Sequence, residues 1–234
     1  MRHLSTVVLA ISLTAATGEA QMPNTLTESE RRAGWQLLFD GKSTAGWHGY
    51  GKRPAPAGWQ VVDGALTRVA TAGDLVTDGS YGDFELTLEW KVAPGGNSGI
   101  FYRGVDNEDW RKVPLYHTAP EMQVLDDAGH ADGKSPLTSA GSLYGLYPAP
   151  SGIVKPADQW NSVRIVVAGA QVEHWLNGVK VVDYRLGGAD WTAKVKASKF
   201  AEWPGYGKSP TGVIGLQDHG DRVAFRNIKL LARD

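Results

Sequence analysis

From Gly34 onward the sequence consists of short runs in which apolar and polar residues alternate, and turn residues separate these runs. In the clearest run, 84–92, five apolar residues alternate with four polar ones. This period of two is typical of a β-strand that buries one face. Asn177-Gly178 interrupts another alternating stretch, 172–184, which predicts a β-hairpin with a two-residue turn. A chain of this kind buries its apolar residues by pairing strands into sheets.

The fold class follows from the number and spacing of these runs. About a dozen short strands, with no amphipathic helix of ten residues among them, predict an all-β sandwich. Twenty-nine Gly and twelve Pro supply the many turns that such a fold needs. No repeat of fixed period is present, so a propeller is not expected. Residues 34–234 are therefore predicted to form a single β-sandwich domain, and 191–207, rich in lysine and aromatic residues, an insertion at its rim.

Charge and composition narrow the classes of partner. The formal net charge is -1 at pH 7, whereas binding to phosphates needs a clustered excess of lysine and arginine. We therefore expect no nucleic acid partner. The nine Trp and eight Tyr are more informative. Most such rings fill a sandwich core, and others can stack against the apolar face of a sugar.

The N-terminus has the pattern of a secretory signal peptide. Arg2 and His3 precede an apolar run over 4–14, and cleavage is predicted before Gln21. Residues 1–20 are therefore expected to be a signal peptide, and the protein to be exported, either periplasmic or secreted. The apolar run is too short for a transmembrane helix, so no membrane insertion is expected after cleavage.

A polar segment, 21–33, follows the predicted signal peptide and leads into the domain. Its residues 27–30 have the pattern of a helix start, and we expect a short lead-in that is weakly attached. The loops 105–119 and 129–155 are long for a compact domain, and loops of this length are usually functional or mobile. No cysteine is present, so the domain must be stable without disulfides.

Polar side chains share one face at two strand ends. Glu121 and Gln123 alternate with apolar residues, so both are expected to point away from the core. Gln217 and His219 share a face in the same way near the C-terminus, and Asn97 precedes another strand. Aligned amide and carboxylate groups donate to and accept from vicinal hydroxyls, as sugar sites require. These strands are therefore predicted to build a polar cleft for a carbohydrate.

Several of these residues could carry chemistry. His219 is a candidate general base because imidazole titrates near neutral pH, and a structural histidine bound to a loop carbonyl is the alternative. His174 lies in an alternating strand and is expected in the core. Glu121, Asp126 and Asp218, with His219, could bind a divalent cation, although no standard ligand spacing is present.

The strand 121–126 has a second interpretation. Its spacing is that of the Glu-x-Asp-x-x-Glu strand of retaining jelly-roll glucanases, whose nucleophile and acid lie roughly 5 Å apart. In this sequence Gln123 stands at the central Asp position and Asp126 at the second Glu position. A shorter acid and a central amide do not suit ordinary retaining chemistry.

A set of short motifs occurs in a fixed order along the chain. The motifs are Leu38-Phe39-Asp40-Gly41-Lys42, Gly46-Trp47, Gly96-Asn97-Ser98-Gly99-Ile100, Glu121-Met122-Gln123-Val124-Leu125-Asp126, Trp175-Leu176-Asn177-Gly178 and Gly215-Leu216-Gln217-Asp218-His219-Gly220. The ordered set resembles the DUF1080 family, also called the 3-keto-disaccharide hydrolase domain, over 34–231. Membership implies a concanavalin A-like jelly-roll β-sandwich of two antiparallel sheets, export, and action on glycosides oxidised at carbon 3.

The chemistry that this family implies needs a base and a group that stabilises an enolate. A ketone at carbon 3 acidifies the hydrogen on carbon 2. Removal of this proton lets the oxygen on carbon 1 leave by β-elimination, and water can add afterwards. His219 or Glu121 is the expected base. Arg103, or a divalent cation held by Glu121 and Asp218, would stabilise the enolate.

The expected substrate contacts are Asn97, Gln123, Gln217, Tyr102 and Tyr144. The competing function is a non-catalytic carbohydrate-binding module, because the same sandwich with the same polar face could hold a glycan without reacting. A catalytic site should be a closed pocket that contains a base of perturbed pKa. A lectin site is instead shallow and open.

Overall fold

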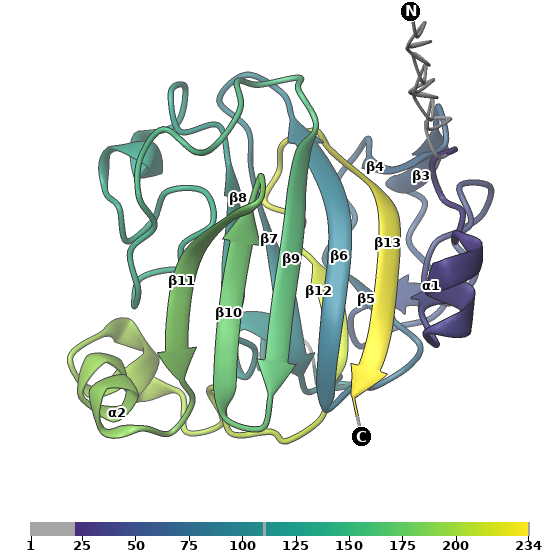
Figure 1. Cartoon of the computed structure of the whole chain (residues 1–234). Helices are drawn as coiled ribbons and strands as arrows, with labels where there is room; N and C mark the ends of the chain where they lie inside the picture. Colours follow the sequence, from purple (N-terminus) through teal and green to yellow (C-terminus); the bar gives the residue numbers. More distant parts are fainter. Residues whose placement is uncertain (1–21, 110, 234) are drawn as a thin grey trace, which may run out of the picture.

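Two antiparallel β-sheets pack face to face in the computed structural model, which describes residues 22–109 and 111–233. The larger sheet lies in front of the smaller one in the view of Figure 1. The predicted all-β jelly-roll sandwich of two antiparallel sheets is thus confirmed. The predicted signal peptide, 1–20, lies outside the described residues.

The larger sheet has eight strands in the order β11-β10-β9-β6-β13-β4-β3, with β1 paired to β13 off this path. Its strands are β1 (Gln36–Leu37), β3 (Trp59–Val62), β4 (Ala65–Arg68), β6 (Asp83–Val92), β9 (Asn161–Ala168), β10 (Gln171–Leu176), β11 (Val179–Arg185) and β13 (Val223–Arg233). The predicted hairpin at Asn177-Gly178 is confirmed as β10–β11, since Leu176 pairs with Val179.

The smaller sheet has five strands in the order β2-β5-β12-β7-β8. Its strands are β2 (Trp47–Gly49), β5 (Leu75–Thr77), β7 (Asn97–Gly104), β8 (Glu121–Leu125) and β12 (Val213–Leu216). The helical segments are α1 (Glu28–Arg32), η1 (Leu115–His117), η2 (Ala131–Lys134), α2 (Ala189–Lys196) and η3 (Lys199–Glu202). No helix within 22–109 and 111–233 is long and apolar enough to cross a membrane.

The core lies between the two sheets and follows from the period of two. In β6 the residues at even positions, from Phe84 to Val92, are buried, and those between them are half-buried on the outer face. Ile100 of β7 and Met122 of β8 meet them from the smaller sheet, both fully buried. Burying one such side chain stabilises the fold by about 1.5–3 kcal/mol, so the alternation alone supplies a strong drive for the sheets to pack.

A polar network also lies inside this core. The hydroxyl of Tyr102 lies 2.9 Å from Nε2 of His174 and 2.6 Å from the hydroxyl of Tyr184. His174 is completely buried, and burial lowers its pKa to about 4, so the ring is neutral. The prediction that His174 is a core residue is confirmed.

The outer face of the smaller sheet is only partly covered. Leu115, in η1, packs onto this face at Gly104 and Gly215, where an added Cβ would lie 2.5 and 2.6 Å from its methyl groups. Phe101 and Val76 complete a small buried cluster around Leu115. The chain therefore needs glycine at both positions for η1 to close over one half of the face. The other half, over β7 and β8, stays accessible as the pocket described below.

The lead-in is attached more firmly than its polar sequence predicts. The backbone N–H of Asn24 donates to the side chain of Asn227 at 2.6 Å, and the amide of Asn24 donates to the carbonyl of Gly64. Lys229 also donates to Glu30 of α1 at 2.7 Å. The expectation of weak attachment was wrong, because these pairs join residues distant in the sequence. The predicted helix start is confirmed as a capping box at Thr27.

Candidate active site

A pocket of about 360 Å³ opens on the outer face of the smaller sheet. Its lining combines six of the residues predicted from the sequence with four that were not predicted. The predicted ones are Asn97, Glu121, Gln123, Tyr144, Gln217 and His219, and the others are Tyr116, Lys199, Phe200 and Trp203. The polar cleft expected from the two strand ends is therefore present, and an aromatic wall completes it.

Pairing between β7 and β8 sets the position of Glu121. In this pairing Phe101 lies opposite Glu121 and Gly99 opposite Gln123. The carboxyl group of Glu121 lies over Gly99, where any Cβ would clash with Oε1 of Glu121. The other edge of β8 is held by Ser142, whose carbonyl accepts from the N–H of Gln123. The carboxyl group thus sits on a floor of backbone that has no room for a side chain.

The surroundings of Glu121 favour its neutral form. The side chain is 8% exposed, and burial, assisted by the negative charge of Asp74, raises its pKa to about 8. The positive charge of Lys199 and a hydrogen bond from Gln217 act in the opposite direction. A carboxyl with a pKa near the pH of the reaction is suited to general acid–base catalysis. This is the perturbed group that a catalytic pocket was expected to contain.

The amides beside Glu121 have unused acceptors. Among the described residues, the buried Oε1 atoms of Gln123 and Gln217 have no hydrogen-bond partner. Gln123 donates weakly to Oδ1 of Asn97 at 3.4 Å, and the backbone N–H of Gln217 donates to Gly99 at 3.0 Å. A buried acceptor without a partner costs free energy, and a ligand hydroxyl can supply the missing donor. The floor is therefore arranged to bind hydroxyl groups.

Aromatic rings form the wall above this floor. Trp203 lies stacked against His117 with ring centroids 4.3 Å apart, and Tyr116 contacts Trp203 at 5.2 Å. Phe200 packs edge to face on Trp203 at 5.4 Å. Rings of this kind offer an apolar surface to a sugar while the floor offers polar groups.

Lys199 brings a positive charge to the pocket. Its ammonium lies 4.6 Å from the ring centroid of Tyr144 and 5.4 Å from that of Phe200. Contacts with the faces of the rings hold a cation in place by electrostatic attraction. Sequence reasoning missed Lys199, and the high lysine and aromatic content of 191–207 was the signal that could have found it.

Arg103 does not reach this pocket, which corrects the prediction that it stabilises an enolate. Its backbone adopts φ of 50°, a left-handed conformation that turns the side chain away from the floor. The guanidinium pairs with Asp83 at 2.7 Å and also donates to the carbonyls of Gly82 and Gly169. Arg103 therefore joins β7 to the start of β6 and to the turn between β9 and β10 in the larger sheet.

Tyr102 does not reach the pocket either, which corrects its assignment as a substrate contact. The side chain is completely buried, and its hydroxyl belongs to the core network with His174 and Tyr184. It alternates with Phe101 along β7 and so points to the opposite face of the sheet.

The predicted cation site of Glu121 and Asp218 is not formed. The carboxylate of Asp218 pairs with Arg68 at 2.6 Å and accepts from the N–H groups of Ala72 and Gly73. Burial, the largest single influence, raises the pKa of Asp218, but the N–H groups of Ala72 and Gly73 together with the charge of Arg68 outweigh it and hold this pKa below its usual value. Within 22–109 and 111–233 no group of three or more His, Asp or Glu side chains is placed to hold a metal.

The pair of carboxyls that a retaining glucanase needs is also not assembled. Oδ2 of Asp126 accepts from the backbone N–H of Gly95 at 2.8 Å, and Asp126 does not line the pocket that contains Glu121. Asp126 is therefore part of a turn that supports the strand, and the glucanase interpretation is not supported.

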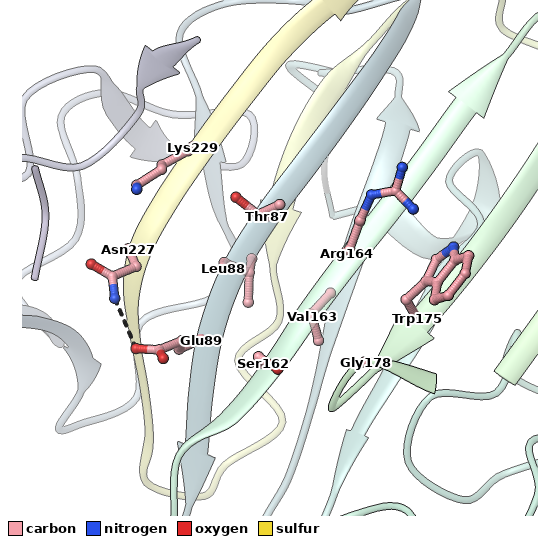
Figure 2. Close-up of a pocket in the computed structure, with 10 residues that line it drawn as sticks. All are labelled: Thr87, Leu88, Glu89, Ser162, Val163, Arg164, Trp175, Gly178, Asn227 and Lys229. Atoms are coloured by element: carbon pink, nitrogen blue, oxygen red, sulfur yellow. Dashed lines mark hydrogen bonds between the residues drawn. The ribbon is translucent and has the colours of Figure 1, made fainter. Parts of the chain in front are cut away.

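A second cavity, of about 320 Å³, lies on the outer face of the larger sheet. Figure 2 shows the side chains that line it, which come mainly from β6, β9, β10 and β13. Its charged groups are paired: Glu89 accepts from Asn227 at 2.8 Å, as Figure 2 shows. Arg164 pairs with Glu85, and Lys229 with Glu30. Among the described residues that line this cavity the only carboxyl is Glu89, which is already paired with Arg226 and Asn227, so this face is the weaker candidate.

Comparison with known proteins agrees with the geometry of the first pocket. The model of the 3-keto-alpha-glucoside-1,2-lyase-like domain family matches residues 34–231. The chain belongs to this family. A 3-keto-disaccharide hydrolase from Bacteroides thetaiotaomicron is 39% identical over an alignment of 229 residues that covers 86% of this chain and 79% of that protein.

Solved structures agree with this assignment. A candidate glycosyl hydrolase from Parabacteroides distasonis superposes with a TM-score of 0.83 at 34% identity, over 91% of this chain and 100% of that one. The carbohydrate binding module CBM66 from Bacillus subtilis has a TM-score of 0.50 at 12% identity, over 79% of this chain and 94% of that one, and shares the fold alone. The family member described here is a carbohydrate-processing enzyme.

Proposed function

We propose that this enzyme cleaves glycosides whose sugar is oxidised to a ketone at carbon 3, with Glu121 as the base. The observation that supports this most directly is a buried carboxyl, with a pKa raised to about 8, on a floor of hydroxyl-binding amides. Membership of the 3-keto-alpha-glucoside-1,2-lyase-like family and the similarity to the 3-keto-disaccharide hydrolase of Bacteroides thetaiotaomicron support the 3-keto substrate.

The first step is removal of the proton on carbon 2. The ketone makes this proton acidic, and the electron pair of the C–H bond moves to the oxygen on carbon 3. Because the pKa of the Glu121 carboxyl lies near 8, its ionised form is a stronger base than an ordinary carboxylate. His219 is exposed at the rim of the pocket, and we assign the base to the buried group instead.

The second step expels the leaving group. The enolate collapses back to the ketone, a double bond forms between carbons 1 and 2, and the oxygen on carbon 1 departs and takes up a proton. Water can then add to carbon 1 while a proton returns to carbon 2, which gives net hydrolysis. Only one carboxyl is needed as the base, and Glu121 is sufficient.

Lys199 and the amides stabilise the charge and the position of the sugar. The ammonium of Lys199 is close enough to Glu121 to lower its pKa, so it can also stabilise negative charge on an enolate oxygen in the same pocket. Asn97, Gln123 and Gln217 bind hydroxyls. Tyr144 and Trp203 cover the ring of the sugar.

Deuterium labelling tests this proposal. The enzyme is incubated in D₂O with a disaccharide that carries a ketone at carbon 3 of one ring, and the released sugars are analysed by mass spectrometry and NMR. Proton abstraction predicts deuterium on carbon 2 of the oxidised product, or a 1,2-unsaturated sugar. Cleavage without any label at carbon 2 would contradict it.

Two variants separate the candidates for the base. Glu121→Gln keeps the shape of the side chain and should abolish cleavage, with a loss of at least about 100-fold. His219→Gln should retain most of the activity. The reverse result would transfer the role of base to His219.

A non-catalytic carbohydrate-binding module is the alternative function. The buried and perturbed carboxyl of Glu121 is a feature that binding alone does not require. If the intact 3-keto disaccharide raised the melting temperature of the protein and no product formed, the binding module would be favoured.

We also propose that the protein is exported to the periplasm or secreted. The apolar run over 4–14, after Arg2 and His3, supports this proposal. Fractionation of the host cells followed by N-terminal sequencing tests it. A mature chain that begins at Gln21 is expected, and an uncleaved chain in the cytoplasm would contradict export.

A further inference from the structure

A third cavity, of about 350 Å³, lies on the same sheet as the candidate active site and is not used by the proposed mechanism. It is lined by Tyr50, Lys52, Gly73, Asp74, Arg111, Pro114 and Leu115. It resembles the active-site pocket in size, and both cavities fall within the range of small-ligand sites.

The pairing of the strands connects the two cavities. Leu216 of β12 pairs with Ile100 of β7 on one side and with Leu75 of β5 on the other. Gln217 lines the active-site pocket and directly follows Leu216, the last residue of β12. Asp74 lines the third cavity and directly precedes Leu75, the first residue of β5. The two strands run antiparallel, so both residues lie at the same end of the pair. They are therefore neighbours at the same end of the sheet, about one strand spacing of 4.8 Å apart.

Hydrogen bonds fix this neighbourhood. The N–H of Asp218 donates to Oδ1 of Asp74 at 2.9 Å, and the N–H of Gln217 donates to the carbonyl of Gly99. On the far side, the N–H of Tyr50 donates to the carbonyl of Asp74 at 2.9 Å. The residues from Gln123 across to Tyr50 thus form one row over the five strands.

Helix η1 borders both cavities. Its first residue, Leu115, lines the third cavity, and its second, Tyr116, lines the active-site pocket. From Gln123 to Asp74 the row crosses three strand spacings, about 14 Å, a span that two linked sugar rings can cover. The two cavities therefore lie on either side of η1, within reach of one ligand of two rings.

The lining of the third cavity suits a hydroxylated ring. Pro114 is half-buried and offers apolar surface, with the buried Tyr50 and Leu115 behind it, and the phenol of Tyr50 is fixed because it donates to the carbonyl of Val113 at 2.7 Å. Lys52 donates to the carbonyl of Ala72 at 3.1 Å, which keeps its ammonium at the edge of the cavity. Arg111 brings a second cation to the same lining. Cationic donors form strong hydrogen bonds to hydroxyl oxygens.

We propose that this third cavity is a second sugar-binding subsite, which holds the leaving sugar of a 3-keto disaccharide. This inference rests on the proposed function, since it assigns the oxidised ring to the pocket of Glu121. It makes Lys52 and Arg111 determinants of specificity for the leaving group. It also predicts a preference for disaccharides over glycosides whose leaving group is a small alcohol.

Kinetics with two substrates test the subsite. One is a glucosyl glucoside oxidised at carbon 3 of one ring, and the other is the methyl glucoside oxidised at the same carbon. The readout is the ratio of kcat/KM for the disaccharide to kcat/KM for the methyl glucoside. The Lys52→Met and Arg111→Met variants, and the double variant, keep the side-chain stems and remove the donors. Lys112→Met is the matched control, because Lys112 is exposed and pairs with Asp109 outside the cavity.

The double variant should lower the ratio at least about tenfold, which corresponds to about 1.4 kcal/mol of lost binding to the transition state. The control should keep the ratio of the unmodified enzyme. If the ratio of the double variant stayed within twofold of that of the unmodified enzyme, the subsite would be overturned. Cleavage of both substrates in the same experiment would still support the proposed function. If the unmodified enzyme cleaved neither substrate, the proposed function would fail and the subsite with it.

Discussion

Replacing Glu121 by Gln should remove activity and at the same time stabilise the protein at neutral pH. The carboxyl is buried and its pKa is raised from 4.5 to about 8. A group whose pKa is raised on folding stabilises the folded state only while it is protonated. Its contribution is complete below pH 4.5 and is lost as the pH rises towards 8.

The size of the effect follows from the two pKa values. Between pH 4 and pH 7 the wild-type protein should lose on the order of 3 kcal/mol of unfolding free energy through Glu121 alone. The amide of Glu121→Gln does not titrate, so the variant keeps this free energy. The difference in stability between variant and wild type should therefore grow by the same amount over this range.

Urea unfolding at pH 4 and pH 7, followed by fluorescence of the tryptophans, measures the difference. Glu202→Gln, on the exposed face of η3, is the control for a glutamate outside the pocket. If the stability of Glu121→Gln relative to wild type were the same at both pH values, the carboxyl would not be buried in the unfavourable environment described here.

Three further predictions concern the supports of the site. Gly99→Ala should lower kcat/KM at least about tenfold, because the new methyl group would displace the carboxyl group of Glu121. Unchanged kinetics would show that Gly99 is not needed to position this carboxyl group. Asp74→Asn should move the rising, acid-side limb of the pH–rate profile, set by ionisation of the base Glu121, to lower pH, because the negative charge of Asp74 raises the pKa of Glu121; a limb at the same pH would refute this coupling. Tyr102→Phe should lower the unfolding free energy by about 1–3 kcal/mol, since it leaves His174 and Tyr184 without their partner, while kcat/KM stays within twofold. A large loss of activity without a loss of stability would return Tyr102 to the site.

The sequence was sufficient for the sheets and for the polar floor of the pocket. Alternation over 84–92 predicted β6, and the same period of two put Glu121 and Gln123 on one face, as the structure has them. The period would also have excluded Tyr102, because this residue alternates with Phe101 and must point into the core. That error came from residue type, since a tyrosine near a polar strand end suggests a sugar contact.

Other parts of the site could not be read from local patterns. Arg103 follows the same period as Asn97, but the left-handed backbone at Arg103 turns its side chain to Asp83, and a φ value is not visible in the sequence. Lys199 and Trp203 come from a segment far from Glu121 in the chain and meet it only through tertiary packing. Asp218 was predicted as a ligand from its motif, whereas its partner Arg68 lies in a distant strand.

The pocket takes its floor and its wall from two different kinds of structure. The floor belongs to β7, β8 and the residues after β12. The opposite face of these strands packs into the hydrophobic core. Lys199 and two rings of the wall, Phe200 and Trp203, belong to η3 and the residue that follows it, next to α2 (Figure 1). Substitutions in this rim segment during evolution would therefore change which substituents of the sugar the enzyme accepts, without changing the base or the fold. In this family we expect substrate range to follow the rim segment and reaction type to follow the strands.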